Sequence, residues 1–255
     1  MRGLAVLELL AERGPLRAAE ISGLLEMPRP SVYRALAALT ECGYVERTEG
    51  GRGFSLGAAV LRLVDRAERS MLVPLATSAM DTLARATRET VNLAALEGQR
   101  LVYVAIVHSS WSLRPSAAVG DVIAPHATAV GKAVLGCLAP RDRAVLTGPE
   151  PFPAFTAATR TSHAGLAKEL AAAASRGYAL DREETEVGAS CVAAPIIGVH
   201  GRPVGALSVS GLTARMPENR LAEVGADVRR FADLISAGLR ETASQRPLVP
   251  TTSEE

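Results

Sequence analysis

The sequence MPRPSVYRALAAL, residues 27–39, decides how the first part of the chain folds, because it has the pattern of a short helix with one apolar face. Two prolines mark its start, since proline is tolerated in the first turn of a helix. Val32, Leu36 and Leu39 then recur at helical spacing, which predicts that one face packs inward. The opposite face carries Arg and Tyr side chains that can reach phosphates or base edges. Alone, the pattern also fits a solvated surface helix.

Length and composition indicate one large or two modest domains. The 255 residues are 48% hydrophobic but only 4% aromatic, so the core must consist of Leu, Val, Ala and Ile. The net charge is +1, so any nucleic-acid binding must come from a local patch. Three scattered cysteines form neither a disulfide framework nor a metal-ligand spacing, and no uncharged run reaches membrane-spanning length. We therefore expect a cytoplasmic protein without membrane association, and no motif indicates a cofactor.

The residues around this helix predict a winged helix-turn-helix domain over residues 1–60. Apolar spacing indicates one helix near residues 4–10 and a second near residues 21–25. After the third helix, residues 44–47 and 53–56 are typical of two short strands joined by a Gly-rich turn. Three short helices followed by a β-hairpin make up this type of domain.

The candidate DNA contacts lie on the third helix and at the tip of the hairpin. Eight arginines in residues 1–65 are balanced by eight acidic residues, so the DNA-binding interpretation depends on the order and spacing of the elements. A winged-helix module that binds another protein is the alternative. The predicted DNA-contacting residues are Arg29, Pro30, Ser31, Tyr33 and Arg34 on the helix and Arg52 on the hairpin.

In the rest of the chain, the sequence predicts a linker helix over residues 61–71, and this helix continues to about residue 88. Residues 72–242 are predicted to form an α/β domain built on an antiparallel sheet. The expected strands are residues 91–95, 101–107, 113–119, 178–181, 191–197 and 203–210. The expected helices are residues 128–138, 165–175 and 221–239. The polar segment 243–255 is expected to be a disordered tail.

Three features of this second domain could converge on one ligand pocket. The segment 127–132 opens a helix with small residues, and its free N–H groups suit an anion such as a carboxylate. Ser208 and Ser210 are two apart on a strand, so their hydroxyls point to the same face. Asp181 and Cys191 lie near the ends of neighbouring strands. Each feature also has a purely structural explanation: a helix cap, satisfied serines and a core cysteine.

The sequence resembles the IclR family of bacterial transcription regulators over most of its length. EISGLLEMPRPSVYRALAALTECGYVER and GGRGFSLG are similar to the family's N-terminal domain. PHATAVGKAVL, GYALDREETEVGASCVAAP and GALSVSG are similar to its effector domain. The resemblance implies an α+β chain in which a winged helix-turn-helix and a linker helix precede a GAF-like α/β effector-binding domain. The chain departs from the family pattern at Ile197–Gly198, where an aromatic residue and Asp or Asn are usual.

The resemblance also implies a function and a set of partners. It implies a ligand-responsive regulator of a catabolic or metabolic operon that binds double-stranded operator DNA, senses a small organic acid, and forms a homodimer or homotetramer. Backbone donors of the small residues and polar side chains from the strands would contact the effector. The implied effector-binding residues are Ala129, Val130, Asp181, Cys191, Ser208 and Ser210.

Enzyme and metal-site interpretations are weaker. Cys191 as a nucleophile would need a base, and no histidine shares a short motif with it, although His126 could approach it in space. His126, Asp181 and Cys191 could together hold zinc. Gly131–Lys132 lacks the flanking residues of a phosphate-binding loop. We expect neither catalysis nor a metal; the alternative is a winged-helix protein-interaction module with a catalytic or metal-binding C-terminal domain.

Overall fold

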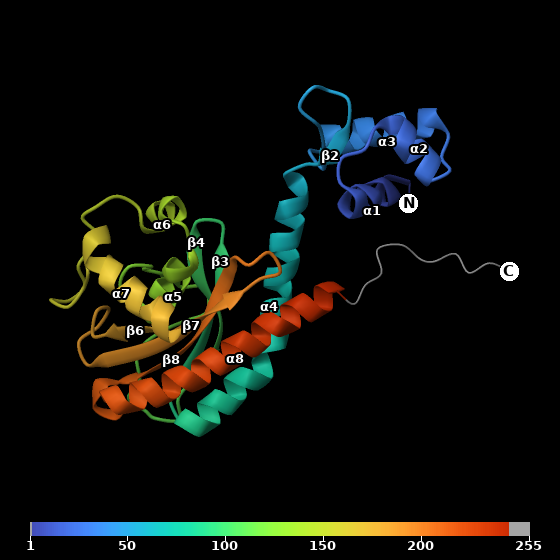
Figure 1. Ribbon diagram of the computed structural model, residues 1–255. Coiled ribbons are helices and arrows are strands. Elements are labelled where there is room, and N and C mark those ends of the chain that lie inside the picture. Colours follow the sequence, from blue (N-terminus) through green and yellow to red (C-terminus); the bar gives the residue numbers. More distant parts are fainter. Residues whose placement is uncertain (1, 245–255) are drawn as a thin grey trace. The chain divides into compact units, whose positions relative to one another are not determined.

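A computed structural model describes residues 2–244 of the chain, which form two compact units (Figure 1). The first unit extends to Ala67 and the second comprises Glu68–Ala243. Most of the predicted tail, residues 243–255, lies outside the described residues; Ala243 and Ser244 end the last helix. No helix among the described residues is both long and apolar enough to cross a membrane.

The N-terminal unit is three helices followed by a two-stranded hairpin, as the sequence predicts. Its elements are α1 (Arg2–Arg13), α2 (Ala18–Leu24), α3 (Arg29–Glu41), β1 (Val45–Arg47) and β2 (Phe54–Leu56). The buried apolar residues of α3 are on the predicted stripe: Val32 and Leu36 have 0% and 1% exposure. They pack against Val6 and Ile21 of the other helices and Phe54 of the hairpin. This packing leaves the other face of α3 exposed.

Local signals explain the bounds of these helices. The carboxylate of Glu20 accepts a hydrogen bond from the backbone N–H of Arg17 at 2.6 Å, which satisfies a free amide at the start of α2. Pro28 is the N-cap of α3, and Pro30 lies in its first turn. Gly43 follows the end of α3 with a φ of 74°, a left-handed conformation that glycine adopts without steric cost.

The linker is part of one long helix, α4 (Ala59–Thr87), which has 29 residues and continues into the second unit. Its Glu68 is buried and accepts a hydrogen bond from the backbone N–H of Val199 at 2.6 Å. A Cβ on Gly198 would lie only 2.6 Å from the Glu68 carboxylate. The departure from the family pattern at Gly198 therefore makes room for a buried acidic side chain.

The C-terminal unit contains a six-stranded antiparallel sheet in the order β5-β4-β3-β8-β7-β6. Its strands are β3 (Thr90–Glu97), β4 (Arg100–Val107), β5 (Val122–Ile123), β6 (Ala179–Arg182), β7 (Ala189–Ile197) and β8 (Pro203–Leu212). The helices that follow α4 are α5 (Ala129–Cys137), α6 (Pro140–Thr147), α7 (His163–Arg176) and α8 (Glu218–Ser244), with a short 3₁₀ turn, η1 (Thr213–Arg215).

Helices cover both faces of this sheet (Figure 1). On one face, α4 and α8 pack over alternate strand residues such as Val91 and Leu93. On the other face, α5 and α7 pack over the intervening positions, including Ala94 and Ala206. Because successive side chains of a strand point to opposite faces, the polar side chain of Asn92 lies on the α5 face.

Two parts of the predicted domain are wrong. The strand expected at residues 113–119 is irregular backbone, and Leu113 and Val119 are 69% and 63% exposed there. Residues 140–147, for which no element was expected, form the helix α6. A proline at its first position and Gly148 directly after its end, with a φ of 75°, mark the bounds of that helix.

Candidate functional site

A cavity of about 430 Å³ lies on the α5 face of the sheet, within the C-terminal unit. Its wall comes from α5, from strands β3, β4, β6, β7 and β8, and from the irregular segment after β4. All six residues that the sequence predicts as effector contacts line it: Ala129, Val130, Asp181, Cys191, Ser208 and Ser210. The topology therefore brings together residues that are up to 81 positions apart.

The N-terminus of α5 forms one end of the cavity. Thr128 is its N-cap: the hydroxyl accepts a hydrogen bond from the Gly131 N–H at 3.0 Å and donates to the Ala124 carbonyl at 2.9 Å. Ala129 and Val130 follow as the first two helical residues, whose N–H groups have no partner within a helix. A Cβ on Gly131 would lie 2.2 Å from the Pro125 carbonyl oxygen, so only glycine permits this close packing.

Strands β3 and β8 supply a buried polar cluster. Asn92 lies opposite Ser208 in the sheet register, and its side-chain amide donates to the Ser208 hydroxyl at 3.3 Å and to the Ser210 hydroxyl at 3.1 Å. All three side chains line the cavity and are at most 6% exposed. Asn92 was not predicted, although an amide between apolar residues on a strand is a signal that could have identified it.

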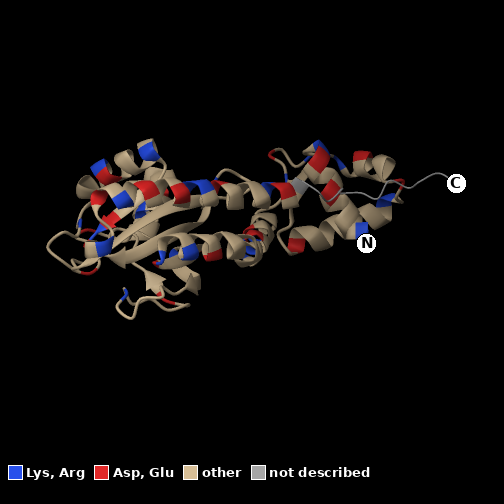
Figure 2. Cartoon of the chain, turned by 90° about the horizontal axis from the view of Figure 1, so that it is seen from below, with Lys and Arg blue, Asp and Glu red and all other residues tan. Residues whose placement is uncertain are grey.

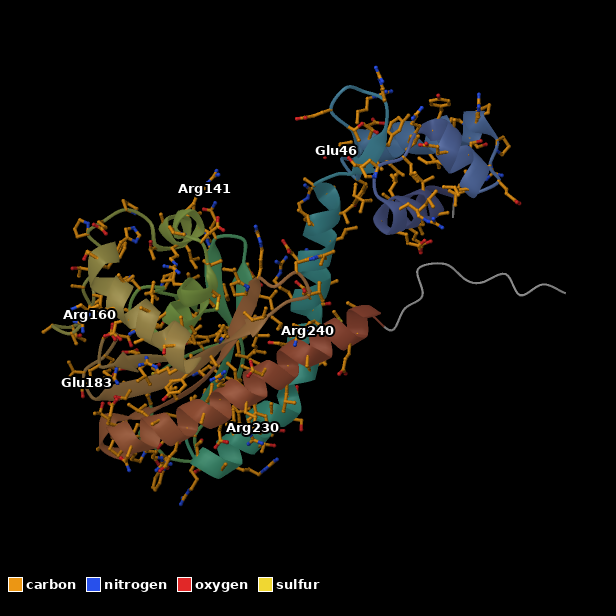
Figure 3. All side chains as sticks on the ribbon, viewed as in Figure 1. Glu46, Arg141, Arg160, Glu183, Arg230 and Arg240 are labelled. Atoms are coloured by element: carbon orange, nitrogen blue, oxygen red, sulfur yellow. The ribbon has the colours of Figure 1, made fainter. Side chains whose placement is uncertain are left out.

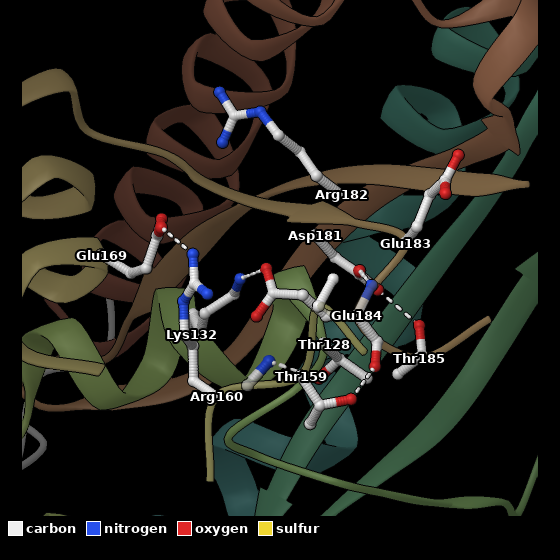
Figure 4. Close-up of polar contacts among 12 residues, drawn as sticks. Thr128, Lys132, Thr159, Arg160, Glu169, Asp181, Arg182, Glu183, Glu184 and Thr185 are labelled. Atoms are coloured by element: carbon white, nitrogen blue, oxygen red, sulfur yellow. Dashed lines mark hydrogen bonds and ion pairs between the residues drawn. The ribbon is translucent and has the colours of Figure 1, made fainter. Parts of the chain in front are cut away.

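Asp181 and Cys191 are direct partners in the β6–β7 register. The Asp181 carboxylate accepts hydrogen bonds from the Glu184 N–H at 2.8 Å and from the Thr185 hydroxyl at 2.5 Å, as Figure 4 shows. Burial raises the pKa of Asp181 above its ordinary value, and the Thr185 hydrogen bond partly opposes this shift. Burial, with a smaller effect of the nearby Asp181, raises the pKa of the Cys191 thiol. A protonated thiol is a poor nucleophile.

An ion pair outside the predicted set holds the loop after β6 against α5. Lys132, 1% exposed, forms an ion pair with Glu184, and the Glu184 carbonyl accepts a hydrogen bond from the Thr159 hydroxyl at 2.7 Å (Figure 4). Arg160 and Glu183 mark the same edge of the unit in Figure 3. Lys132 is the only charged residue in the apolar stretch 129–138, a signal of burial, but its partner Glu184 lies 52 positions away and was not predicted.

The irregular segment from residue 108 to residue 121 forms another wall of the cavity through Pro115, Ser116 and Ala117. Trp111 anchors it: the guanidinium carbons of Arg88 and Arg215 lie 4.7 Å and 5.2 Å from the centre of its ring. Arg215 also donates two hydrogen bonds, at 2.5 and 2.8 Å, to the buried carboxylate of Glu89. This segment is therefore tied to the strands that carry the cavity's polar side chains.

The His126 side chain is engaged by other groups and does not join Asp181 and Cys191 in the zinc site considered from the sequence. The His126 ring is hydrogen-bonded to the Pro153 carbonyl at 2.8 Å, and it packs against Phe152 and Phe155 with ring centres 5.1 and 5.7 Å away. Among the described residues, no group of three or more His, Cys, Asp or Glu side chains is arranged to hold a metal ion.

The exposed face of α3 carries most of the predicted DNA contacts. Arg29, Pro30 and Arg34 are exposed, and Tyr33 is 56% exposed. Arg52 is exposed in the turn of the hairpin. Figure 2 shows acidic and basic residues side by side on the N-terminal helices, as the zero net charge of the region implies.

Ser31 differs from the other residues of this group because it is only 9% exposed. Its hydroxyl accepts hydrogen bonds from the guanidinium groups of Arg34, at 3.3 Å, and Arg2, at 3.5 Å. Ser31 lies beside the apolar stripe of α3, where the next residue, Val32, is 0% exposed. Ser31 is therefore placed to orient Arg34, and its direct contact with DNA stays a prediction.

Comparisons with known proteins match both units. A family model described as the IclR helix-turn-helix domain covers residues 1–49, and one described as the bacterial transcriptional regulator IclR C-terminal covers residues 65–237. The chain is 33% identical to the HTH-type transcriptional regulator BhcR of Paracoccus denitrificans, covering 96% of this chain and 89% of the relative. It is 32% identical to the regulator KdgR of Escherichia coli, covering 93% and 90%.

Solved structures also match the chain over most of its length. The IclR protein of Thermotoga maritima matches with a TM-score of 0.64 and 26% identity, covering 93% of this chain and 97% of that one. The repressor BlcR of Agobacterium tumefaciens matches with a TM-score of 0.61 and 26% identity, covering 92% and 94%. The winged helix-turn-helix, the cavity-bearing antiparallel sheet and the two family models together show that this chain belongs to the IclR family of bacterial transcriptional regulators.

Proposed function

We propose that the protein binds operator DNA through α3 and the β1–β2 hairpin, and that a small organic acid in the cavity of the C-terminal unit changes this binding. The observation that carries the proposal is the convergence of six predicted contacts on one cavity of about 430 Å³. A volume of this size suits a small metabolite. The α5 N-terminus supplies N–H donors for its carboxylate.

The proposed DNA contacts are Arg29, Pro30, Tyr33 and Arg34 on α3 and Arg52 on the hairpin, with Ser31 orienting Arg34. The exposure of these arginines supports contacts to phosphates and base edges in the major groove. Because the region has no net positive charge, specific contacts must contribute more to affinity than a general electrostatic field.

The proposed domains are the winged helix-turn-helix, residues 1–60, the linker, residues 61–71, and the effector-binding domain, residues 72–242. We further propose a cytoplasmic homodimer or homotetramer. Leu4, Leu61 and Leu63 support self-association, since each is more than half exposed although large and apolar. Analytical ultracentrifugation of the full chain would measure the oligomeric state.

The decisive experiment is a gel shift of the full chain with the DNA upstream of its own gene. Sequence-selective binding that weakens with salt is expected, because arginine–phosphate contacts release counterions. Binding that is equal for unrelated DNA would contradict the proposal and favour a protein-interaction role for the N-terminal unit. The same assay, repeated with small carboxylic acids, tests whether a ligand changes the affinity.

A further inference from the structure

The cavity wall carries acidic side chains but no basic ones. Asp121, Asp181 and Glu186 line it, and among the described lining residues there is no Lys, Arg or His. Lys132 is paired with Glu184 and does not line the cavity. A ligand with several negative charges would therefore face like charges without a cation to compensate them.

The N-terminus of α5 is the part of the wall that suits an anion. This helix has nine residues, and the N–H groups of Ala129 and Val130 at its start lack partners within the helix. The partial positive charge at a helix N-terminus favours a negatively charged group. This end of the cavity can therefore hold one carboxylate.

A second, independent observation concerns what the rest of the ligand must offer. The side-chain oxygen of Asn92 is buried and has no hydrogen-bond partner among the described residues, and the residue is 1% exposed. Its N–H groups donate to Ser208 and Ser210, and Asn92 lines the cavity, so the oxygen is the polar atom of this side chain that lacks a partner. A buried acceptor without a donor is costly, and an O–H or N–H group of a ligand would satisfy it.

We infer that the ligand is a monocarboxylic acid that carries hydroxyl or ammonium donors, and that dicarboxylic acids are selected against. This inference rests on the proposed function, because it takes the cavity to be the effector site. The carboxylate lies at the N-terminus of α5, and the donors face Asn92 and the carboxylate of Asp181. Buried acceptors that a ligand leaves unpaired discriminate strongly between similar ligands.

The test uses four six-carbon acids that differ only at the end remote from the carboxylate: hexanoate, 6-hydroxyhexanoate, 6-aminohexanoate and adipate. Isothermal titration calorimetry on the full chain is expected to show at least one of the hydroxy and amino acids binding about tenfold or more tightly than both adipate and hexanoate. One hydrogen bond to a buried or charged group supplies a factor of this size. Whichever of the hydroxy acid and the amino acid binds more tightly identifies the donor of the ligand as hydroxyl or ammonium.

The substitution Asp181→Asn tests the electrostatic part of the argument. Asn can still accept from the Glu184 N–H and can donate to the Thr185 hydroxyl, so the local structure is retained. The affinity ratio between the preferred acid and adipate is expected to narrow several-fold in this variant. Asp142→Asn, an equal charge change on the exposed side of α6, is the matched control and should leave the ratio unchanged.

Adipate binding as tightly as both donor-bearing acids would overturn the inference, and so would a failure of all four acids to bind at millimolar concentration. Neither result decides the proposed function, which is judged by the gel shift with upstream DNA and by its response to a wider set of acids. A regulator that binds its operator and responds to a dicarboxylic acid would keep the proposed function and lose the inference.

Discussion

The ammonium group of Lys132 and the carboxylate of Glu184 form an ion pair in the interior of the C-terminal unit, where both side chains are almost fully buried. The pair joins α5, whose N-terminus lies at the cavity, to the loop that follows Asp181. Burial raises the pKa of Glu184, and the attraction of Lys132 opposes that shift. The loop with its carboxylates and the helix with its free N–H groups are thus held in one arrangement.

Breaking this pair is expected to destabilise the fold. Lys132→Met leaves a buried carboxylate without a cation, which costs about 3–5 kcal/mol in the free energy of unfolding. Urea denaturation at neutral pH measures it. Lys168→Met, the same change at an exposed position and at the only other lysine, should have little effect.

The double substitution Lys132→Met with Glu184→Leu separates the cost of an unpaired charge from the loss of a favourable contact. Because an apolar replacement of a buried pair is often neutral, most of the lost stability should return. A double variant as unstable as Lys132→Met alone would show that the pair stabilises the fold in its own right.

Arg34→Ala is expected to weaken operator binding without unfolding the protein, because the side chain is exposed. Loss of one charge-assisted contact should reduce affinity by about 10- to 100-fold in a gel shift. If the contact is to a phosphate, the slope of log affinity against log salt concentration should also become less steep by about one. Arg100→Ala, an exposed arginine of the other unit, serves as the control. Equal affinities of the two variants would count against α3 as the DNA-reading helix.

Ser210→Ala and Asp181→Ala are expected to abolish the response to the effector while leaving operator binding intact. Both side chains line the cavity, and neither belongs to the unit that is proposed to bind DNA. The measurement is a gel shift with and without an acid that alters binding of the unchanged protein. Ser175→Ala, at an exposed position of α7, is the control. A normal response in both cavity variants would show that the effector site lies elsewhere.

The raised pKa of Asp181 predicts a pH-dependent stability. Because burial raises the folded-state value, the folded protein holds its proton more tightly than the unfolded chain does. The resulting contribution to the free energy of unfolding is fully present below the ordinary pKa of 3.8, and it is lost as the pH rises through the pKa of the folded state. Asp181→Asn should therefore gain stability relative to the unchanged protein as the pH rises, as urea denaturation at a series of pH values can measure. A constant difference between the two proteins would contradict this account.

The parts of the site that sequence patterns predicted depend on short-range periodicity. Ser208 and Ser210 are two apart on a strand, so they had to share a face, and both line the cavity. The packing of α3 follows in the same way from Val32 and Leu36 at i, i+4. Register across the sheet is not visible in such patterns, so the pairing of Asn92 with Ser208 could not be predicted.

The errors have physical causes as well. Residues 113–119 contain alternating apolar residues, but Pro115 cannot donate a ladder hydrogen bond, and the neighbouring edge of the sheet is occupied by β5. Tertiary packing here outweighs a local preference.

Trp111, held between Arg88 and Arg215, is the only tryptophan in the chain. The segment that carries it also supplies a wall of the cavity through Pro115, Ser116 and Ala117. Indole fluorescence depends on its immediate surroundings, so any compound that displaces this segment should alter the emission of the unlabelled protein. The molecule thus contains its own optical reporter, and a library of metabolites could be screened against it without a dye, a tag or knowledge of the operator.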